Sequence, residues 1–468
     1  MRRNLVVYIV IAVLILVGTV SLYQALRPLN IEKIELHYLP ENRLRVRVNV
    51  TTNKSSSVQI KYWLDGSRDT LWSDVYADES DHAVILYNFL PQRQYAYQVK
   101  AQRGSDTDWS NVYSIETKSI YHATPYFTLD SLVDSIREDM QSRYFLTQIL
   151  TEPGAAVILN GLGDMVWYEP FSKGVKVSSW TPDRTVLCIV GSEDIPSSGG
   201  DEIVEVNLKG EYLKHFKVGQ GDMDKMVHHE VRKDADGNIY AITFDHKVFD
   251  LSTAGGGPAD TVKADGIVVF DPDGKKIWEW SVLDHLDVLH YPTILKDKSD
   301  LVHGNALYDD GNGHFLMSFR DLNQIWKINR KTGDVVWKFG QGGDFTMQED
   351  DLFFAQHYVH INRRGELMIL DNGVKRKQSR ALAFKLDETN RQYRRVLEIK
   401  YPPAFFSSVK GNSALLGESS VLTCLTDPRL FVLSDYEGNL LWKISIGGDP
   451  YRIEEVPLLT TTTPWTAN

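Results

Sequence analysis

Cysteine is nearly absent from this chain of 468 residues, which contains two copies, Cys188 and Cys424. So few thiols exclude a zinc site built from paired CxxC motifs. Each cysteine lies inside a strand-like apolar run, TVLCIV or VLTCLT. We therefore expect two buried free thiols, with a disulfide between neighbouring elements as the alternative.

Long basic runs are also missing. The chain has 51 Lys and Arg against 62 Asp and Glu, which gives a net charge of −11. This balance disfavours nucleic acid as a partner. It also means that a site for an anionic ligand must supply its own local positive charge.

One long hydrophobic run stands at the N-terminus, from Leu5 to Leu22, directly after Arg2 and Arg3. Its length is close to the ~20 residues that cross a bilayer as a helix. The preceding charges predict an N-terminus inside and the rest of the chain outside. We expect segment 1–27 to be a retained anchor that spans the inner membrane with residues 4–26. A cleaved signal peptide is the alternative, and in both cases the folded part is exported to the periplasmic side.

A repeated hairpin determines the expected fold of the larger part of the chain. Each copy reads as strand, polar turn and strand, and the copies begin at residues 157, 202, 266, 324, 380 and 430. Five further hairpins lie between them, beginning at residues 177, 228, 303, 356 and 412. Repeats of this spacing are typical of propeller blades, so residues 155–468 are predicted to form a six-bladed β-propeller. The tail YRIEEVPLL (451–459) is expected to supply the missing inner strand of the first blade, because closing the ring removes an exposed edge.

Two regions precede the propeller. Residues 30–118 contain alternating apolar runs with turn residues between them, which predicts a small β-sandwich. The phrase LPQRQYAYQV in this region resembles the tyrosine corner of fibronectin type III domains. Residues 119–154 are predicted to be a linker with a connecting helix, because apolar residues from Leu129 to Met140 fit helical spacing. The overall fold class is therefore all-β, with a transmembrane helix at the N-terminus.

Polar residues recur at one position of the inner hairpins. His229, Asn305 and His357 each lie eight residues before the turn glycine of their hairpin, and His303 lies two residues before Asn305. Residues two apart on a strand point to the same side, and inner strands line the central channel. These side chains are thus expected to meet at one mouth of the channel, with Arg320 at the end of the strand that follows His303.

This set of residue types suits transfer of a tetrahedral anionic group. A neutral histidine can attack sulfur or phosphorus and carry the group covalently. A second histidine can give a proton to a departing phenolic oxygen, because its pKa lies near neutrality. The Arg320 guanidinium and the Asn305 amide can bind the oxygens of the transferred group.

The segments HHEVRKDADGNIYAI, HGN…LMSFR and QHYVHINRRGELMILDNG, followed by SRALAFKLDE, resemble the bacterial arylsulfate sulfotransferases. The resemblance covers residues 155–460 and implies a six-bladed propeller that moves a sulfuryl group from an aryl sulfate to a phenol. It implies a ping-pong reaction through a sulfohistidine, without a nucleotide sulfate donor, a metal or another cofactor.

Carried onto this chain, the resemblance makes His357 the nucleophile and Arg320 the anion clamp. His303 and Asn305 become donors to the sulfuryl or phenolic oxygen. His229 is the remaining site histidine, with His228 as the alternative, and Phe353 and Phe354 are expected to stack on the aryl ring. The chain departs from the family in having Glu230 where an aspartate is common, and in lacking a short-range cysteine pair near the site.

Two other functions stay open at this point. Three histidines can hold zinc or iron in a metal-dependent hydrolase, although Arg320 beside a dication is unfavourable. A propeller can also bind a sulfated or glycan ligand without catalysis. The expected partners are an aryl sulfate, a phenol and a membrane, with a homodimer as a further possibility.

Overall fold

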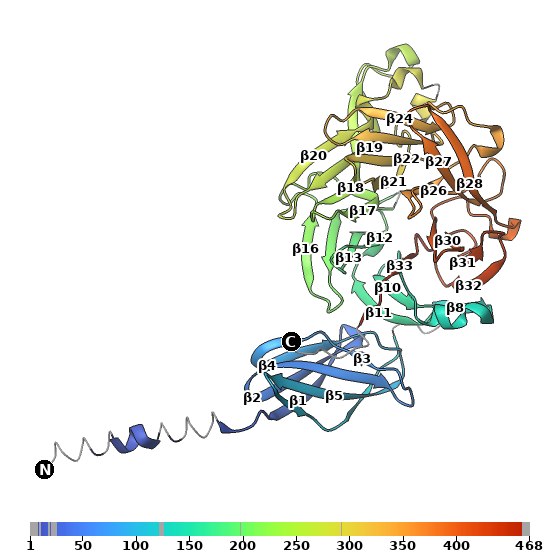
Figure 1. Cartoon of the computed structure of the whole chain (residues 1–468). Helices are drawn as coiled ribbons and strands as arrows, with labels where there is room; N and C mark the ends of the chain where they lie inside the picture. The colour runs from blue at the N-terminus through green and yellow to red at the C-terminus, as the bar shows by residue number, and fades with distance from the viewer. Residues whose placement is uncertain are drawn as a thin grey trace. The chain divides into compact units, whose positions relative to one another are not determined.

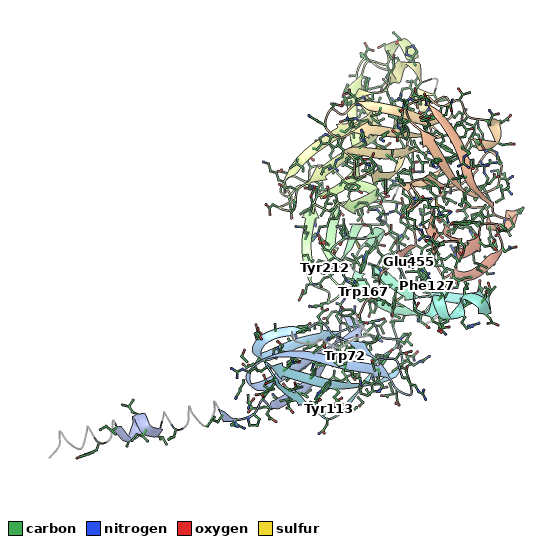
Figure 2. All side chains as sticks on the ribbon, in the orientation of Figure 1. Trp72, Tyr113, Phe127, Trp167, Tyr212 and Glu455 are labelled. Atoms are coloured by element: carbon green, nitrogen blue, oxygen red, sulfur yellow. The ribbon has the colours of Figure 1, made fainter. Side chains whose placement is uncertain are left out.

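The computed structural model describes residues 26–120, 126–196, 198–291 and 293–460, together with residues 8, 11–16 and 19. The chain divides into two compact units. The first comprises residues 1–86, 92–119 and 460–468, and the second comprises residues 87–91 and 120–459. Figure 1 shows both units as mainly β-structure, and in Figure 2 Trp72 and Tyr113 mark the first unit, Phe127 and Trp167 the second.

The first unit is an all-β domain built around one long strand, β2 (Asn42–Leu64). The first half of β2 pairs with β1 (Ile31–Leu39) and β4 (Tyr76–Leu86). Its second half pairs with β5 (Gln94–Arg103). Three short strands complete the unit, β3 (Leu71–Trp72), β6 (Asp106–Trp109) and β7 (Tyr113–Glu116). The strands predicted within residues 30–118 are present and belong to one seven-stranded sheet. The β-sandwich and its likeness to fibronectin type III domains stay predictions.

The second unit consists of six antiparallel sheets in sequence order, which are the six predicted blades. Blade 1 contains β33 (Glu454–Val456), β9 (Tyr144–Ile149), β10 (Gly154–Asn160) and β11 (Met165–Phe171). Blade 2 contains β12 (Gly174–Trp180), β13 (Val186–Gly191), β15 (Glu202–Val206) and β16 (Tyr212–Lys217). Blade 3 contains β14 (Gly199–Gly200), β17 (Val227–Lys233), β18 (Ile239–Phe249), β19 (Asp260–Phe270) and β20 (Lys276–Ser281).

The remaining three blades repeat this order from an inner to an outer strand. Blade 4 contains β21 (Gly304–Asp309), β22 (His314–Phe319), β23 (Gln324–Asn329) and β24 (Val335–Gly340). Blade 5 contains β25 (His357–Ile361), β26 (Leu367–Asp371), β27 (Arg380–Asp387) and β28 (Gln392–Lys400). Blade 6 contains β29 (Asn412–Leu416), β30 (Ser420–Leu425), β31 (Leu430–Asp435), β32 (Leu440–Ile446) and β8 (Phe127–Leu132).

Both ends of the propeller chain close the ring. The C-terminal β33 is the inner strand of blade 1 and pairs with β9, as the sequence predicted for the tail. The N-terminal β8 adds a fifth strand to the outer edge of blade 6 by pairing with β32. Figure 1 shows β33 in the same blade as β10, and β8 below β32. Two strands from opposite ends thereby remove edges that would otherwise be exposed.

The predicted connecting helix is the main correction to the fold. Residues Phe127–Leu132 form β8, and only Arg137–Gln141 form an α-helix, α2, after the short 3-10 turn η1 (Asp134–Ile136). Strand β9 also lies within the segment assigned to the linker. The apolar residues at Leu129 and Leu132 belong to a strand, because pairing with β32 outweighs the helical spacing of a short segment. The other short helices are α3 (Ile294–Asp297) and the 3-10 turns η2 (Ser252–Ala254), η3 (Val282–Asp284), η4 (Val288–His290), η5 (Glu349–Asp351) and η6 (Pro403–Phe405).

The hydrophobic core lies between successive blades. One cluster joins blades 3 and 4 through Ile267 and Trp326, and another joins blades 4 and 5 through Trp337 and Phe384. Because each blade buries its faces only against its neighbours, the ring is stable as a whole. Cys188 and Cys424 are buried free thiols of β13 and β30, which confirms the expectation.

The predicted membrane anchor, residues 4–26, falls mostly outside the described residues. Tyr8, residues 11–16 and Thr19 are helical and exposed. In the described part of the chain, no helix is long and apolar enough to span a bilayer.

Candidate active site

Three inner strands begin at the same mouth of the propeller, and each begins irregularly. The pairing register shifts between His228 and Val231 in β17, between Gly304 and Ala306 in β21, and between His357 and His360 in β25. Such bulges re-aim side chains and are frequent beside active sites. His229 and His303 adopt positive φ values of 58° and 52°, which non-glycine residues rarely do. Backbone strain of this kind persists only where the surrounding structure fixes it, and it marks this mouth as a candidate site.

His357, at the start of β25, is buried and locked in one orientation. Its Nδ1 lies 2.7 Å from Oδ1 of Asn372, and the Asn372 amide nitrogen donates to the carbonyl oxygens of Ser407 and Lys410, each at 3.0 Å. Because those carbonyls fix the amide, Oδ1 must accept and His357 Nδ1 must carry the proton. The backbone N–H of Lys410 donates to Nε2 over 3.2 Å, which agrees with a lone pair there. Burial, together with the charges of Arg320 and His303, lowers the pKa of His357 to about 3 despite the Asn372 hydrogen bond. The imidazole is therefore neutral, with Nε2 as its nucleophilic atom.

Two residues that hold His357 were not predicted as site residues. Asn372 follows β26 in the phrase LDNG, so a polar residue directly after an inner hairpin was the available signal. Gln356 is fully buried, and its amide nitrogen donates to Ser318 Oγ and to the carbonyls of Phe319 and Gln324. These bonds fasten the start of β25 to blade 4.

His303, just before β21, carries a proton. Its Nδ1 lies 2.7 Å from Oδ2 of Asp300. Burial alone would lower the pKa of His303, but the Asp300 hydrogen bond and the charges of Asp300, Asp265 and Asp321 raise it above its usual value. The surroundings of His303 therefore favour its protonated form, whereas those of His357 favour the neutral ring.

His228 and His229 occupy different positions, although both are buried. The His229 ring packs edge-on against His303 with 4.9 Å between ring centroids. His228 lies behind it, stacked on Phe244 at 4.1 Å, and the two Nδ1 atoms are 2.8 Å apart. Burial and the surrounding positive groups, His303 foremost, lower the pKa of both rings. The structure thus brings His229, rather than His228, to the other site histidines.

Asn305 and Arg320 reach the site in different ways. The Asn305 amide nitrogen donates 2.8 Å to the Gln356 carbonyl, and its Oδ1 is buried without a partner in the described chain. Asn305 therefore positions the backbone before His357 and presents an acceptor rather than the expected donor. Arg320 follows β22, donates its backbone N–H to the His303 carbonyl at 3.0 Å, and forms a 2.6 Å ion pair with Asp321. Its half-buried cation is close enough to disfavour a charge on His357.

The two phenylalanines expected to stack on a substrate lie apart from the open site. Phe353 is fully buried in the core between blades 4 and 5, where it packs on Phe339 and Phe384. The ring of Phe354 is covered by Lys375 and Arg376, at 4.4 and 4.8 Å from its centroid. Because other side chains occupy their faces, neither ring is assigned a substrate contact.

A cavity of about 550 Å³ adjoins these residues, and its lining includes Ser198, Lys410, Lys176, Tyr126 and Arg429. Two of its lining residues contact the site histidines. The backbone N–H of His229 donates to the Ser198 carbonyl over 3.4 Å, and the backbone N–H of Lys410 donates to His357. This volume suits a small aromatic molecule. Three cations, Lys176, Lys410 and Arg429, line the cavity together with two carboxylates, Glu193 and Asp449, so its lining has a small positive balance. Arg429 is paired with Asp449 at 3.0 Å. Lys176 is buried, and burial lowers its pKa.

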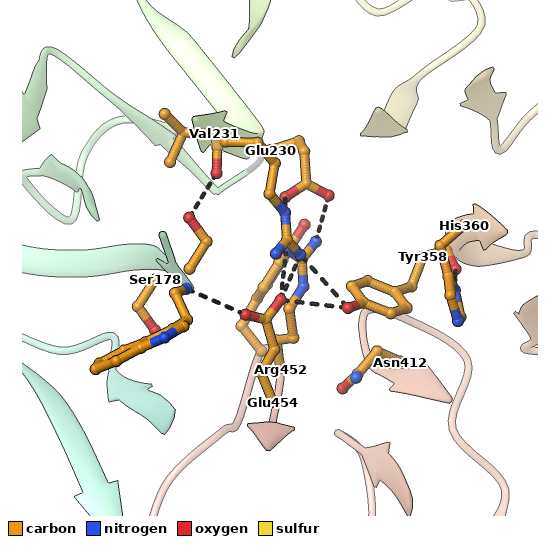
Figure 3. A network of polar contacts seen from close by, with 12 residues as sticks. Ser178, Glu230, Val231, Tyr358, His360, Asn412, Arg452 and Glu454 are labelled. Carbon is orange, nitrogen blue, oxygen red and sulfur yellow. Dashed lines mark hydrogen bonds and ion pairs between the residues drawn. The ribbon is translucent and has the colours of Figure 1, made fainter. Parts of the chain in front are cut away.

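A buried ion network holds the backbone next to the site (Figure 3). Glu230 binds both terminal nitrogens of Arg452, at 2.5 and 2.7 Å, and accepts 3.0 Å from Arg232 Nε. Arg232 also pairs with Glu454, which accepts 3.3 Å from the Tyr358 hydroxyl. Two cations and two anions balance, which buried charges require. Glu230 therefore anchors the C-terminal closing segment to β17 instead of orienting a histidine ring.

The histidine nitrogens are mostly committed to partners within the protein. Among residues that the structure describes, no group of three or more ligating side chains is arranged to hold a metal ion. The Nδ1 atoms of His228 and His229 face each other, and Nδ1 of His357 faces Asn372. This donor set does not favour a metal-dependent hydrolase.

Comparison with solved structures finds distant likenesses. A protein of unknown function from Bacteroides caccae has 11% identity and a TM-score of 0.44, over 67% of this chain and 99% of that one. Virginiamycin B lyase from Staphylococcus aureus has 12% identity and a TM-score of 0.36, over 72% and 90%. A putative 6-phosphogluconolactonase from Bacteroides fragilis has 12% identity and a TM-score of 0.38, over 86% and 98%. At these values the likeness carries no information about activity.

No curated protein matches the chain. The family model of the arylsulfotransferases (ASST) matches residues 132–445, which include blades 2 to 5 completely and every site residue described above except Tyr126, Asp449 and the closing tail. This span is well over half of the chain, so the protein belongs to the arylsulfotransferase (ASST) family.

Proposed function

We propose that this aryl sulfotransferase moves the sulfuryl group in two steps, through a sulfohistidine formed on Nε2 of His357. The observation that carries the proposal is the locked neutral imidazole. Asn372 keeps the proton on Nδ1, so the lone pair on Nε2 is available at the mouth of the channel. A nucleophile of this kind splits one difficult transfer into two easier ones.

In the first step, Nε2 of His357 attacks the sulfur of the aryl sulfate. The new N–S bond forms as the bond between sulfur and the phenolic oxygen breaks. The phenolate leaves with a proton from His303 or His229, the two histidines that pack against each other. In the second step, another phenol loses its proton and its oxygen attacks the sulfur, which restores neutral His357.

The charge on the sulfuryl oxygens is stabilised by positive groups around the mouth. Arg320 and His303 are the charged groups that lower the pKa of His357. The Lys410 N–H, which donates to Nε2 over 3.2 Å, is free to turn to a sulfuryl oxygen once Nε2 bonds to sulfur. Lys410 has a φ of 54°, a strained conformation that presents this N–H to the site. Preorganised donors of this type supply a large part of catalysis in acyl and phosphoryl transfer.

The donor's aryl group occupies the adjoining cavity in this proposal. Tyr126 offers an aromatic surface there, and Lys176 offers positive charge, whereas Arg429 is paired with Asp449. An aryl sulfate carries a negative charge next to an apolar ring, so it matches a cavity with both features.

Mass spectrometry tests the nucleophile directly. After incubation with 4-nitrophenyl sulfate alone, the native protein should gain ~80 Da, the mass of SO₃, on the peptide that contains His357. His357→Ala should lose both this gain and the acceptor-dependent release of nitrophenol. His360→Ala is the matched control, because His360 lies on the same strand and packs on Tyr358 and Tyr308. Transfer that persists in His357→Ala would disprove the assignment.

The rest of the chain suggests where the reaction takes place. We infer from Arg2, Arg3 and the apolar run after them that residues 4–26 anchor the enzyme to the inner membrane and that it acts on the periplasmic side. In the sequence, the N-terminal domain with its fibronectin-like phrase lies between this segment and the propeller. Fractionation of cells into membrane and soluble parts, with and without residues 1–27, tests this placement.

A further inference from the structure

A buried carboxylate, Asp265, lies behind the histidine pair and takes no part in the mechanism above. It belongs to β19 and is 1% exposed. One of its oxygens, Oδ2, accepts 2.7 Å from the Gly304 N–H, directly after His303. Its other oxygen lies 3.3 Å from Nε2 of His228. That ring nitrogen makes no hydrogen bond among the described residues; Asp265 is the charged group in contact with it, and the Thr243 carbonyl is a further acceptor beside the ring.

The contacts continue from Asp265 into the site. Nε2 of His228 faces Asp265, and Nδ1 of His228 lies 2.8 Å from Nδ1 of His229. His229 in turn packs against His303 at the mouth. Since the two Nδ1 atoms lie within hydrogen-bond distance, one must donate and the other accept. The tautomers of the two rings are therefore coupled, and both depend on whether Asp265 carries a proton.

We propose that Asp265, His228 and His229 form a proton relay that exchanges a proton with the phenolic oxygen during sulfuryl transfer. The inference rests on the proposed function and decides between its two proton donors. His229 is the group that gives and takes the proton. Asp265 and His228 are positioning residues that determine which nitrogen of His229 is protonated.

The relay conserves protons. In the loaded state Asp265 is a carboxylic acid that donates to Nε2 of His228, Nδ1–H of His228 donates to Nδ1 of His229, and Nε2 of His229 bears a proton. When Nε2–H protonates the leaving phenolate, His229 takes the proton of His228 on Nδ1. His228 then takes the proton of Asp265 on Nε2, and the carboxylate remains. A phenol acceptor that gives its proton to Nε2 of His229 reverses each transfer.

The relay avoids a second buried imidazolium. His303 already holds a positive charge through Asp300, and it packs on His229. A proton kept on His229 would add a like charge at this distance, which is unfavourable in a buried site. Passed to Asp265, the same proton neutralises a carboxylate instead.

The groups that face the relay are consistent with this role. Asp265 is contacted by His228 and the Gly304 N–H, and the charges of His303, Asp300 and Lys263 act on it. Burial outweighs the cations among them and raises the pKa of Asp265 to about 7. The groups that face His229 are His303, His228, His357 and Lys410. A carboxyl that titrates near neutrality can both release and take up the proton at working pH.

Acceptors of different acidity test the relay in the full-length enzyme. Each variant is first sulfated with 4-nitrophenyl sulfate, whose leaving group needs no proton, and the size of the nitrophenol burst counts folded active sites. Single-turnover transfer is then measured at pH 8 to phenol, which has a pKa of about 10 as tyrosine does, and to a polyfluorinated phenol that is already ionised. The variants are Asp265→Asn and His228→Asn. Asp245→Asn is the matched control, a buried aspartate of the neighbouring strand that pairs with Lys225.

In Asp265→Asn the side-chain amide donates to Nε2 of His228 and cannot take up a proton, so His229 cannot act as a base. Transfer to phenol should fall about 100-fold, as loss of a general base predicts, while transfer to the ionised phenol changes less than about 3-fold. His228→Asn should behave in the same way, and Asp245→Asn should affect the two acceptors equally.

Two results in variants that keep the burst would overturn the relay: rates of transfer equal to those of the native enzyme, or equal losses of rate with phenol and with the ionised phenol. A native enzyme that shows neither a burst nor a gain of ~80 Da would instead overturn the proposed function. If both relay variants lack a burst, infrared difference spectra of the native protein decide. Sulfation by phenyl sulfate should remove the band of a protonated carboxyl group, and an unchanged band would refute the relay.

Discussion

Asn372 provides the sharpest test of how the nucleophile is prepared. Asn372→Ala removes the oxygen that accepts from Nδ1 of His357 at 2.7 Å. The proton on His357 is then free to move to Nε2, the atom that must attack sulfur. The His357 side chain itself is unchanged, but the variant also releases the Ser407 and Lys410 carbonyls that the Asn372 amide binds. A loss of rate therefore reports the tautomer and orientation of the ring together with the position of Lys410.

The size of the effect follows from the remaining contacts. Loss of one buried hydrogen bond costs about 1–3 kcal/mol. The Ala355 carbonyl, 3.1 Å from Nδ1, can still accept a hydrogen bond from a proton on Nδ1. The Lys410 N–H points at Nε2 and still disfavours a proton on that atom. The loss should therefore be partial. We expect the rate of the nitrophenol burst to fall about 10- to 100-fold, since 1.4 kcal/mol corresponds to a factor of ten.

The burst is measured by rapid mixing with 4-nitrophenyl sulfate in the absence of acceptor. Asn362→Ala is the matched control, because Asn362 is a buried asparagine of the same blade that bonds to Glu366 in the β25–β26 turn. Its burst rate should match that of the native enzyme. A burst in Asn372→Ala within about 3-fold of the native rate, with full amplitude, would refute the tautomer argument, since even 1 kcal/mol gives a 5-fold effect.

Three further outcomes are expected. Asp300→Asn removes the hydrogen bond that raises the pKa of His303 against the effect of burial. Activity requires the His303 imidazolium and is lost as pH rises through this pKa, so the alkaline limb of the pH profile of kcat/KM should move to lower pH. An unmoved limb would contradict the role of Asp300. Lys176→Met should raise the KM for the anionic donor about 10-fold or more, as expected for loss of a charged contact. The KM for a neutral phenol should stay unchanged. Equal effects on the two KM values would show that Lys176 does not bind the donor. Glu230→Ala leaves Arg452, 2% exposed, without its bidentate partner, so the free energy of unfolding should fall by about 3–5 kcal/mol in urea denaturation. Asp134→Ala, which breaks an exposed ion pair with Arg137, should cost less than about 1 kcal/mol, and similar losses in the two variants would show that the buried network does not stabilise the propeller.

The blades were predictable because their signal is local and repeated. A hairpin with a polar turn between apolar strands appears eleven times, and its turn glycines give a common register for the inner strands. That register placed His229, His303 and His357 at one mouth, where the structure also has them. Residues Leu129 and Leu132 were misread because a strand of six residues at a sheet edge can carry the same apolar spacing as a helix.

The orientation of each side chain at the mouth was not predictable from spacing. Bulges shift the register within one or two residues of each site histidine, and period-two alternation fails there. Asn305 therefore turns its amide to the Gln356 carbonyl instead of into the cavity. Phe353 was predicted to stack on the substrate because it lies shortly before His357 in the sequence. Its ring instead packs on Phe339 and Phe384, which belong to other strands. Contacts between distant strands decide these cases, and they leave no mark in the sequence near the residue concerned.

Ring closure and assembly of the active site depend on the same residues. Arg452 and Tyr451 directly precede the closing strand β33, and the Tyr451 hydroxyl donates 3.0 Å to the His229 carbonyl. Arg452 binds Glu230, the next residue along β17. The tail therefore holds the strained backbone at His229 while it completes blade 1. A propeller that opens at this seam loses the support of His229 at the same moment, so catalytic competence should disappear together with closure of the ring and not at a separate step.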